Sequence, residues 1–206
     1  MRVLFFLILF LTLQSCATKK HNKKLLLPDG IKSATEEIYY VVNNQKKLLS
    51  KKKMVFTKNG RIKHSKTVDS KENLIQETKK KLWFIVESYP DTESYYCKTR
   101  WKPKQRERIS CYTKKQYKQN ENIYHYNKDG TIDKIVDHFT PFHTQYFHYT
   151  NTELSKIIIK DKNDTLIDEI LVNCLAKDDK GTCLKKIRIS TKTNYKQEAL
   201  IIPTYY

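Results

Sequence analysis

Histidines are the residues of this 206-residue sequence whose type and spacing first suggest a chemical site. His138, His143 and His148 recur every five residues, and His125 has a similar local sequence to His148. Imidazole nitrogens are common ligands of zinc and other transition metals. Successive residues of a strand face opposite sides, however, and a strand is expected between His125 and His148. Exposed or cross-strand packed histidines are therefore favoured, and a metal-dependent hydrolase using residues 125–148 is the alternative.

Other sequence motifs of enzymes are absent from the chain. It contains neither the Gly-x-Ser-x-Gly pattern of serine hydrolases nor the His-Glu-x-x-His pattern of zinc proteases. All four glycines, at positions 30, 60, 130 and 181, belong to turn-like segments, so none is left for a phosphate-binding loop. The sequence therefore predicts a protein without catalytic activity or a cofactor.

Four cysteines form two pairs around short turn-like stretches, namely Cys97 with Cys111 and Cys174 with Cys183. In an antiparallel hairpin, each pair would lie directly opposite, within the distance that a disulfide requires. We predict these two disulfides, each stabilising the fold by about 3 kcal/mol or somewhat less. Four buried free thiols are the alternative. Because no Cys-x-x-Cys is present, neither a redox centre nor a zinc knuckle is indicated.

The N-terminus has the organisation of an export signal. Arg2 precedes an apolar stretch over residues 3–13, which is too short for a membrane-spanning helix of about 20 residues. The next residues, Leu13-Gln14-Ser15-Cys16, resemble the lipobox of bacterial lipoproteins, although Gln14 departs from the usual small or aliphatic residue. The resemblance implies a signal peptide over 1–15 and lipid attached to Cys16. An ordinary secretory signal or a buried N-terminal segment is the alternative.

The same resemblance indicates where the protein would lie. Residues 17–28 are polar and basic, and we interpret 16–30 as the lipidated cysteine followed by a tether. Two or three acyl chains on Cys16 would anchor the protein firmly to a membrane. Ala17 is not the aspartate of an inner-membrane retention signal, so the outer membrane is expected. The tether also lacks an acidic export signal, which favours the periplasmic face.

The chain is strongly basic, with 40 Lys and Arg residues against 22 Asp and Glu residues and a formal charge of +18. In an exported protein, this charge favours anionic lipids, anionic glycans or an acidic envelope protein as partners rather than nucleic acid. Scattered lysines can equally form a solvated strand face that protects against aggregation. Charge alone does not choose between these interpretations.

Short segments rich in Tyr, Ile, Val, Phe and Thr, separated by turn residues, predict the fold. The segments are 37–42, 53–56, 82–86, 95–101, 122–126, 146–149, 154–159, 166–172 and 184–189. Asn59-Gly60 and Asp129-Gly130 indicate two-residue hairpin turns, and residues 70–81 are a candidate short helix. We predict one all-β domain over 31–206, an antiparallel meander of successive hairpins. An open sheet, a sandwich and a barrel are all compatible with this pattern.

A weak internal repeat runs through residues 121–190. The pattern is an aromatic residue, any residue, Tyr, a turn, Leu or Ile, two polar residues and Ile; it is seen at 124–135 and echoed at 147–157. It resembles the YD or Rhs-type repeat, with Tyr126-Asn127 and Tyr149-Thr150 replacing the Tyr-Asp pair. Hairpins alone can generate the same pattern. We expect a lipid-anchored, non-catalytic interaction or structural module of the cell envelope.

Overall fold

The computed structural model describes residues 21–43, 45–81, 84–90, 95–102, 106–139 and 141–206. The predicted signal peptide and Cys16 lie outside the described residues. Within these ranges, no helix is both long and apolar enough to cross a membrane.

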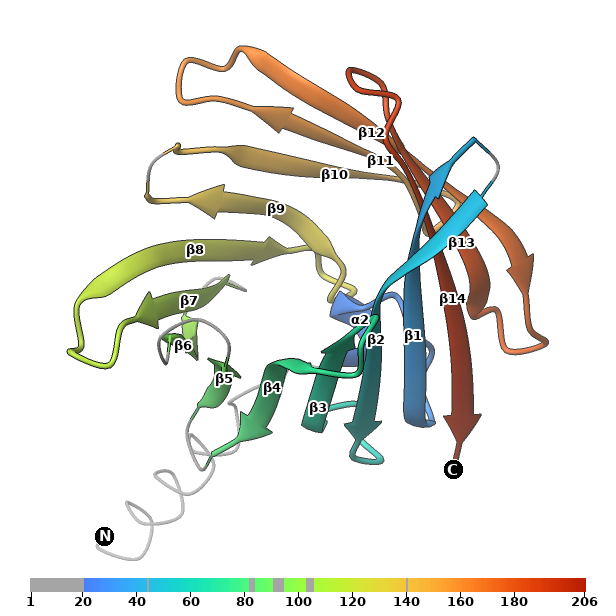
Figure 1. Ribbon diagram of the computed structural model, residues 1–206, viewed down its shortest axis with the longest axis horizontal. Helices are drawn as coiled ribbons and strands as arrows, with labels where there is room; N and C mark the ends of the chain where they lie inside the picture. The colour runs from blue at the N-terminus through green and yellow to red at the C-terminus, as the bar shows by residue number, and fades with distance from the viewer. Residues whose placement is uncertain (1–20, 44, 82–83, 91–94, 103–105, 140) are drawn as a thin grey trace, which may run out of the picture.

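The described residues form a closed, entirely antiparallel barrel around one short helix, α2, at His21–Lys24 (Figure 1). Its strands are β1 (Ile31–Val42), β2 (Gln45–Phe56), β3 (Ile62–Asp69), β4 (Leu74–Lys80), β5 (Ile85–Tyr89), β6 (Tyr95–Lys102), β7 (Arg106–Tyr112), β8 (Lys118–Tyr126), β9 (Ile132–Asp137), β10 (Thr144–Thr150), β11 (Glu153–Lys160), β12 (Leu166–Lys177), β13 (Cys183–Ser190) and β14 (Lys196–Tyr205). Each strand pairs with its neighbours in the chain, which confirms the predicted all-β meander of hairpins.

Closure of the barrel joins the two ends of the chain. β1 pairs with β14 over a long register in which Ile38 lies opposite Ala199. Because every strand then has two partners, no unpaired edge remains in the described sheet. The architecture left open by the sequence is thus a barrel.

The helix predicted over residues 70–81 is wrong. Residues 74–80 form strand β4, in which Thr78 lies opposite Ser65 of β3 and Glu87 of β5. Thr78 is buried, so its side chain belongs to the barrel interior. Pairing with two neighbouring strands outweighs the local helix preference of this polar segment.

The turns at 57–61, 127–131 and 178–182 share one geometry. In each, the glycine N–H donates to the carbonyl oxygen three residues earlier, as from Gly60 to Thr57 at 2.9 Å. Only the glycine has a positive φ, +70° at Gly60 and +91° at Gly130. This is a three-residue hairpin loop, so the predicted two-residue turns are wrong. Asp164 adopts the same position in the turn at 161–165, whereas the turn between β10 and β11 has two successive residues with positive φ, Asn151 and Thr152.

One large apolar cluster fills the end of the barrel at which β1 starts and β14 finishes. Its buried members are Leu27, Ile31, Ala34, Met54, Phe56, Ile62 and Ile201. A second cluster on β11 and β12 contains Leu154, Ile157 and Val172, with Leu26 packed against it. Leu26 and Leu27 therefore join the two clusters from a segment that is not part of the barrel wall.

That segment, residues 21–28, is called here the inner segment. Asn22 is fully buried; its amide nitrogen donates to the Pro28 carbonyl at 3.0 Å and to Asp29 Oδ1 at 2.9 Å. Its backbone N–H donates to the Gly60 carbonyl at 3.0 Å. A Cβ at Gly60 would lie 2.1 Å from Asn22 Oδ1, so glycine permits this close approach. Residues 21–28, expected to be a tether, are instead ordered within the curve of the sheet (Figure 1).

Candidate functional site

A cavity of about 540 Å³ lies between the inner segment and strands β11 to β13. The inner segment contributes Lys23, Leu26, Leu27 and Pro28; the strands and their turns contribute Asp129, Thr131, Thr152, Glu153, Leu154, Val172, Cys174, Lys177, Gly181, Cys183 and Lys186. This volume is within the range of small-molecule sites, about 300–1,000 Å³. The cavity is therefore large enough for a compact ligand.

One part of the cavity wall is apolar. Leu154 and Val172 are 8% and 4% exposed, and Leu26 packs against the cluster to which they belong. These side chains face inward because strand residues alternate between the two faces of a sheet. A ligand in this cavity would contact hydrocarbon on this part of the wall and polar side chains elsewhere.

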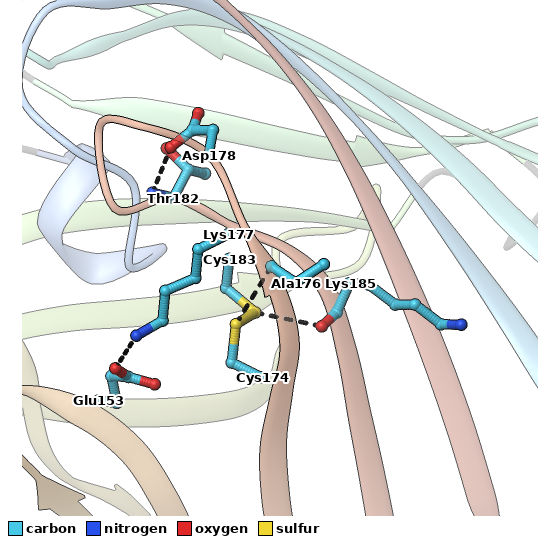
Figure 2. The surroundings of a disulfide bond; sticks show 8 residues. All are labelled: Glu153, Cys174, Ala176, Lys177, Asp178, Thr182, Cys183 and Lys185. Atoms are coloured by element: carbon cyan, nitrogen blue, oxygen red, sulfur yellow. Dashed lines mark hydrogen bonds and ion pairs between the residues drawn. A yellow bond between two sulfur atoms is a disulfide. The ribbon is translucent and has the colours of Figure 1, made fainter.

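The Cys174–Cys183 disulfide belongs to the same wall and joins β12 to β13 (Figure 2). The Cα atoms of the pair are 5.7 Å apart. The second disulfide, Cys97–Cys111, is buried between β6 and β7, where the two residues are direct register partners. Both pairings are therefore as predicted, but Cys174 and Cys183 do not lie directly opposite each other: Cys174 is the register partner of Lys186, and Cys183 that of Lys177.

Two cations at the rim of the cavity are already paired with carboxylates. Lys177 forms an ion pair and hydrogen bond with Glu153 (Figure 2). Lys23 lies 3.6 Å from Asp29. Both pairs are partly exposed, so each contributes little to stability, about 0–1 kcal/mol. Because each of these lysines has a carboxylate partner, the two pairs add little unbalanced positive charge to the rim of the cavity.

Lys186 is the cavity-lining cation with the least contact with solvent, only 6% exposed. Burial, and secondarily the nearby Arg188 guanidinium, lowers the pKa of Lys186 to about 8. The surroundings of the Lys186 amine therefore disfavour its protonated form.

A buried ion pair fixes the inner segment to the opposite wall. Lys24 Nζ lies 3.1 Å from Glu107 Oε2, and their side chains are 18% and 5% exposed. The Tyr126 hydroxyl donates to the same oxygen at 2.6 Å, and the Lys24 ammonium lies 4.2 Å from the Tyr124 ring centroid. Burial alone would lower the pKa of Lys24, but the Glu107 carboxylate raises it above its usual value. The inner segment is thus held by charge as well as by apolar packing.

The four candidate histidines do not converge. His125 on β8 lies opposite Lys134, and His148 on β10 lies opposite Lys156, both on the outer face of the barrel. Partial burial and the Lys134 charge lower the pKa of His125.

His138 and His143 lie near the turn between β9 and β10. The His138 N–H donates to the Glu121 carbonyl, and the His143 carbonyl accepts from the Asp137 N–H, both at 2.8 Å. In the part of the chain that the structure describes, no group of three or more His, Cys, Asp or Glu side chains is arranged to hold a metal. The hydrolase alternative therefore has no ligand set among these residues.

The sequence identified none of the cavity-lining residues as ligand-binding; it indicated Cys174 and Cys183 only as a disulfide pair. Lys186 is one of 40 basic residues, and its burial depends on which face of β13 turns inward. A signal did exist for the inner segment: Leu25-Leu26-Leu27 is an apolar triplet within an otherwise basic stretch. Three consecutive leucines are better explained by packing than by a solvated tether.

No protein-family model matches this sequence, and the search of curated proteins finds no match. Three solved structures have related shapes. A LolA superfamily protein from Nitrosomonas europaea is 8% identical, with 90% of this chain and 92% of that one covered and a TM-score of 0.43. A domain assigned to an outer membrane lipoprotein-sorting protein of Vibrio parahaemolyticus is 5% identical, with 89% and 90% covered and a TM-score of 0.37. A DUF1329 family protein from Desulfovibrio piger is 9% identical, with 86% and 87% covered and a TM-score of 0.35. At these TM-scores, the likenesses place the chain in no family and assign it no activity.

Proposed function

We propose that this chain is a lipid-anchored, non-catalytic binding module of the cell envelope that holds an amphipathic ligand inside its barrel. The observation that carries the proposal is the cavity of about 540 Å³, with one apolar part of its wall and ionisable side chains around it. Such a site suits a molecule with one apolar and one polar part. Binding and release of this ligand require no catalytic group.

The proposed anchor is close to the cavity in the chain. Cys16 is five residues before His21, the first residue of α2, and a fully extended chain of that length spans at most about 18 Å. The inner segment that follows contributes four residues to the cavity lining. Lipid on Cys16 would therefore keep this end of the barrel near the bilayer, from which an amphipathic ligand could enter.

The lipobox and the basic charge support the remaining parts of this proposal. Ala17 favours the outer membrane, and the absence of an acidic export signal favours its periplasmic face. A formal charge of +18 would draw the barrel toward anionic lipid, an anionic glycan or an acidic envelope protein. The protein would thus work at a membrane surface.

The anchor is tested by replacing Cys16 with serine and following the protein in fractionated cells. Cys16→Ser removes the thiol that accepts the lipid and leaves the described barrel unchanged, so the protein is expected to move from the membrane to the soluble fraction. Labelling with a radioactive fatty acid should be lost at the same time. Membrane retention of the unlabelled variant would refute lipid anchoring. Gln14→Ala, which leaves the thiol in place, is the matched control.

The cavity is tested by filling it. Val172→Phe adds a ring to the apolar wall and is expected to weaken binding of N-phenyl-1-naphthylamine, a neutral apolar fluorophore, at least tenfold. Overpacking of the wall should cost only about 1–3 kcal/mol, and circular dichroism melts check that the variant folds. Leu26→Phe fills the cavity from the other side and provides a second test.

Leu166→Phe is the matched control, because Leu166 also lies on β12 but is 58% exposed. It should bind the fluorophore as the unmodified protein does. Equal binding by the unmodified protein and all three variants would show that the fluorophore does not occupy the cavity. The proposed binding function would then be refuted.

A further inference from the structure

Two cations project from β13 into the barrel interior. Lys186 lies opposite Ala199, which is buried, and opposite Cys174, which lines the cavity. Arg188 is two residues further along and therefore lies on the same face of the strand. It lies opposite Val172, another buried residue of the cavity wall. The two positive groups are thus neighbours on the inner face.

No described side chain forms an ion pair with either cation. Within the described residues, Lys186 has no hydrogen bond or ion pair, and the buried Nε of Arg188 has no hydrogen-bond partner. Glu36 on β1 favours the charged form of Lys186 from a distance but forms no ion pair with it. The contrast with Lys23, Lys24 and Lys177 is clear, because each of those lysines has a carboxylate partner.

This arrangement costs free energy in the ligand-free protein. A buried charge without a partner loses its hydration, and two like charges side by side oppose each other. The lowered pKa of Lys186 reflects both effects. An oxyanion placed between the ammonium and the guanidinium would remove both penalties, and a guanidinium is well suited to bind carboxylate or phosphate with two hydrogen bonds.

We infer that Lys186 and Arg188 form a binding site for the oxyanion head group of a single-chain amphiphile whose apolar part lies in the cavity. The inference rests on the proposed binding function and names its ligand class. Carboxylate and phosphate monoester head groups share the required chemistry. A neutral amphiphile of the same length would gain only the apolar contacts.

The test compares dodecanoate, dodecyl phosphate and 1-dodecanol by calorimetric titration below their micelle-forming concentrations. At pH 7 we expect both oxyanions to bind the unmodified protein at least tenfold more tightly than the alcohol. Lys186→Met and Arg188→Met should each weaken oxyanion binding by about 10- to 100-fold, the range for a hydrogen bond to a charged group. Binding of the alcohol should stay within about twofold of the unmodified protein in both variants.

Lys185→Met is the matched control, because it removes the same charge from the outer face of the same strand. Its partner Glu198 retains Lys46. This variant should bind both oxyanions normally. If Lys185→Met and Lys186→Met lost the same oxyanion affinity, the effect would come from net charge alone, and the inference would be overturned.

Stability and pH give readouts that a loss of folding would not produce. Lys186→Met should raise the melting temperature of the ligand-free protein, because it removes an unpaired buried charge. Folding lowers the pKa of Lys186 from 10.5 to about 8, so the unfolded chain holds the extra proton between these values. The ligand-free protein should therefore gain stability as pH rises from 8 to 10.5, and oxyanion binding should weaken over the same interval.

Among the described residues, Arg188 on the same strand and Glu36 on β1 act on Lys186 electrostatically, and the other charged side chains that line the cavity are Lys23, Asp129, Glu153 and Lys177. All of them remain in Lys186→Met, so a pH dependence that survives in this variant would overturn the assignment to Lys186. Titration with inorganic phosphate at millimolar concentration tests the oxyanion site with a ligand that has no alkyl chain.

The outcomes distinguish the two proposals. Tight binding of dodecanol that equals that of dodecanoate would overturn the oxyanion site and leave the binding function in place. If inorganic phosphate bound but none of the three dodecyl compounds did, the result would support the oxyanion site and refute the proposed amphipathic ligand. Absence of binding by all four compounds would overturn both.

Discussion

Glu107→Ala is expected to destabilise the folded protein by about 3 kcal/mol, because it leaves the Lys24 ammonium in the barrel interior without its carboxylate. Removing one partner of a buried ion pair typically costs about 3–5 kcal/mol. The lower figure applies because the Lys24 side chain keeps 18% of its exposure and can reach some water. The Tyr126 hydroxyl loses its acceptor on Glu107 in the same variant, which adds to the cost.

Urea unfolding followed by circular dichroism measures this difference. Glu153→Ala breaks the exposed ion pair with Lys177 and should change stability by less than about 1 kcal/mol. Combining Glu107→Ala with Lys24→Met should recover part of the loss, since the Lys24 ammonium is then no longer left buried without its carboxylate. An equal loss in Glu107→Ala and Glu153→Ala would show that the inner segment is not held by its buried ion pair.

Phe56→Ala is expected to cost about 3–5 kcal/mol, the usual cost of removing a buried aromatic ring. Phe56 has no exposed surface and packs in the cluster that contains Leu27 of the inner segment. Loss of the ring therefore removes apolar contact from both the barrel wall and the segment that it encloses. Thermal unfolding should show a large decrease in melting temperature.

A matched control is Leu166→Ala, which removes a large apolar side chain that is 58% exposed and should change stability by no more than about 0.5 kcal/mol. If Phe56→Ala were as mild as this control, the cluster around Phe56 would not be a principal part of the core. Hydrogen exchange would then be expected to show a more stable region elsewhere in the barrel.

The all-β meander could be predicted from the sequence because its determinants are local. Alternating segments and turn residues specify hairpins, and each pair of cysteines flanks its own turn. Closure could not be predicted, since it depends on pairing Ile38 with Ala199 across most of the chain. The predicted helix at 70–81 failed for the same reason: its strand conformation is imposed by two neighbouring strands.

The cavity could not be predicted, because the alternation of residue types along a strand does not show which face of the strand points into the barrel. In β13, this pattern would place Ile187 and Ile189 inside and the intervening basic residues outside. The register does the opposite, with Ile187 opposite the outward-facing Asn173 and Arg188 opposite the buried Val172. Because alternation cannot tell which face of a strand is enclosed, the inward cations were not identifiable from the sequence.

The pairing of β1 with β14 also determines when the protein can fold. β1 is synthesised well before β14 and must wait for it, and contacts this distant in sequence make folding slow. Until β14 arrives, β1 has an open edge that can pair with another chain. Loss of β14 would therefore leave a partly closed sheet that is prone to aggregation.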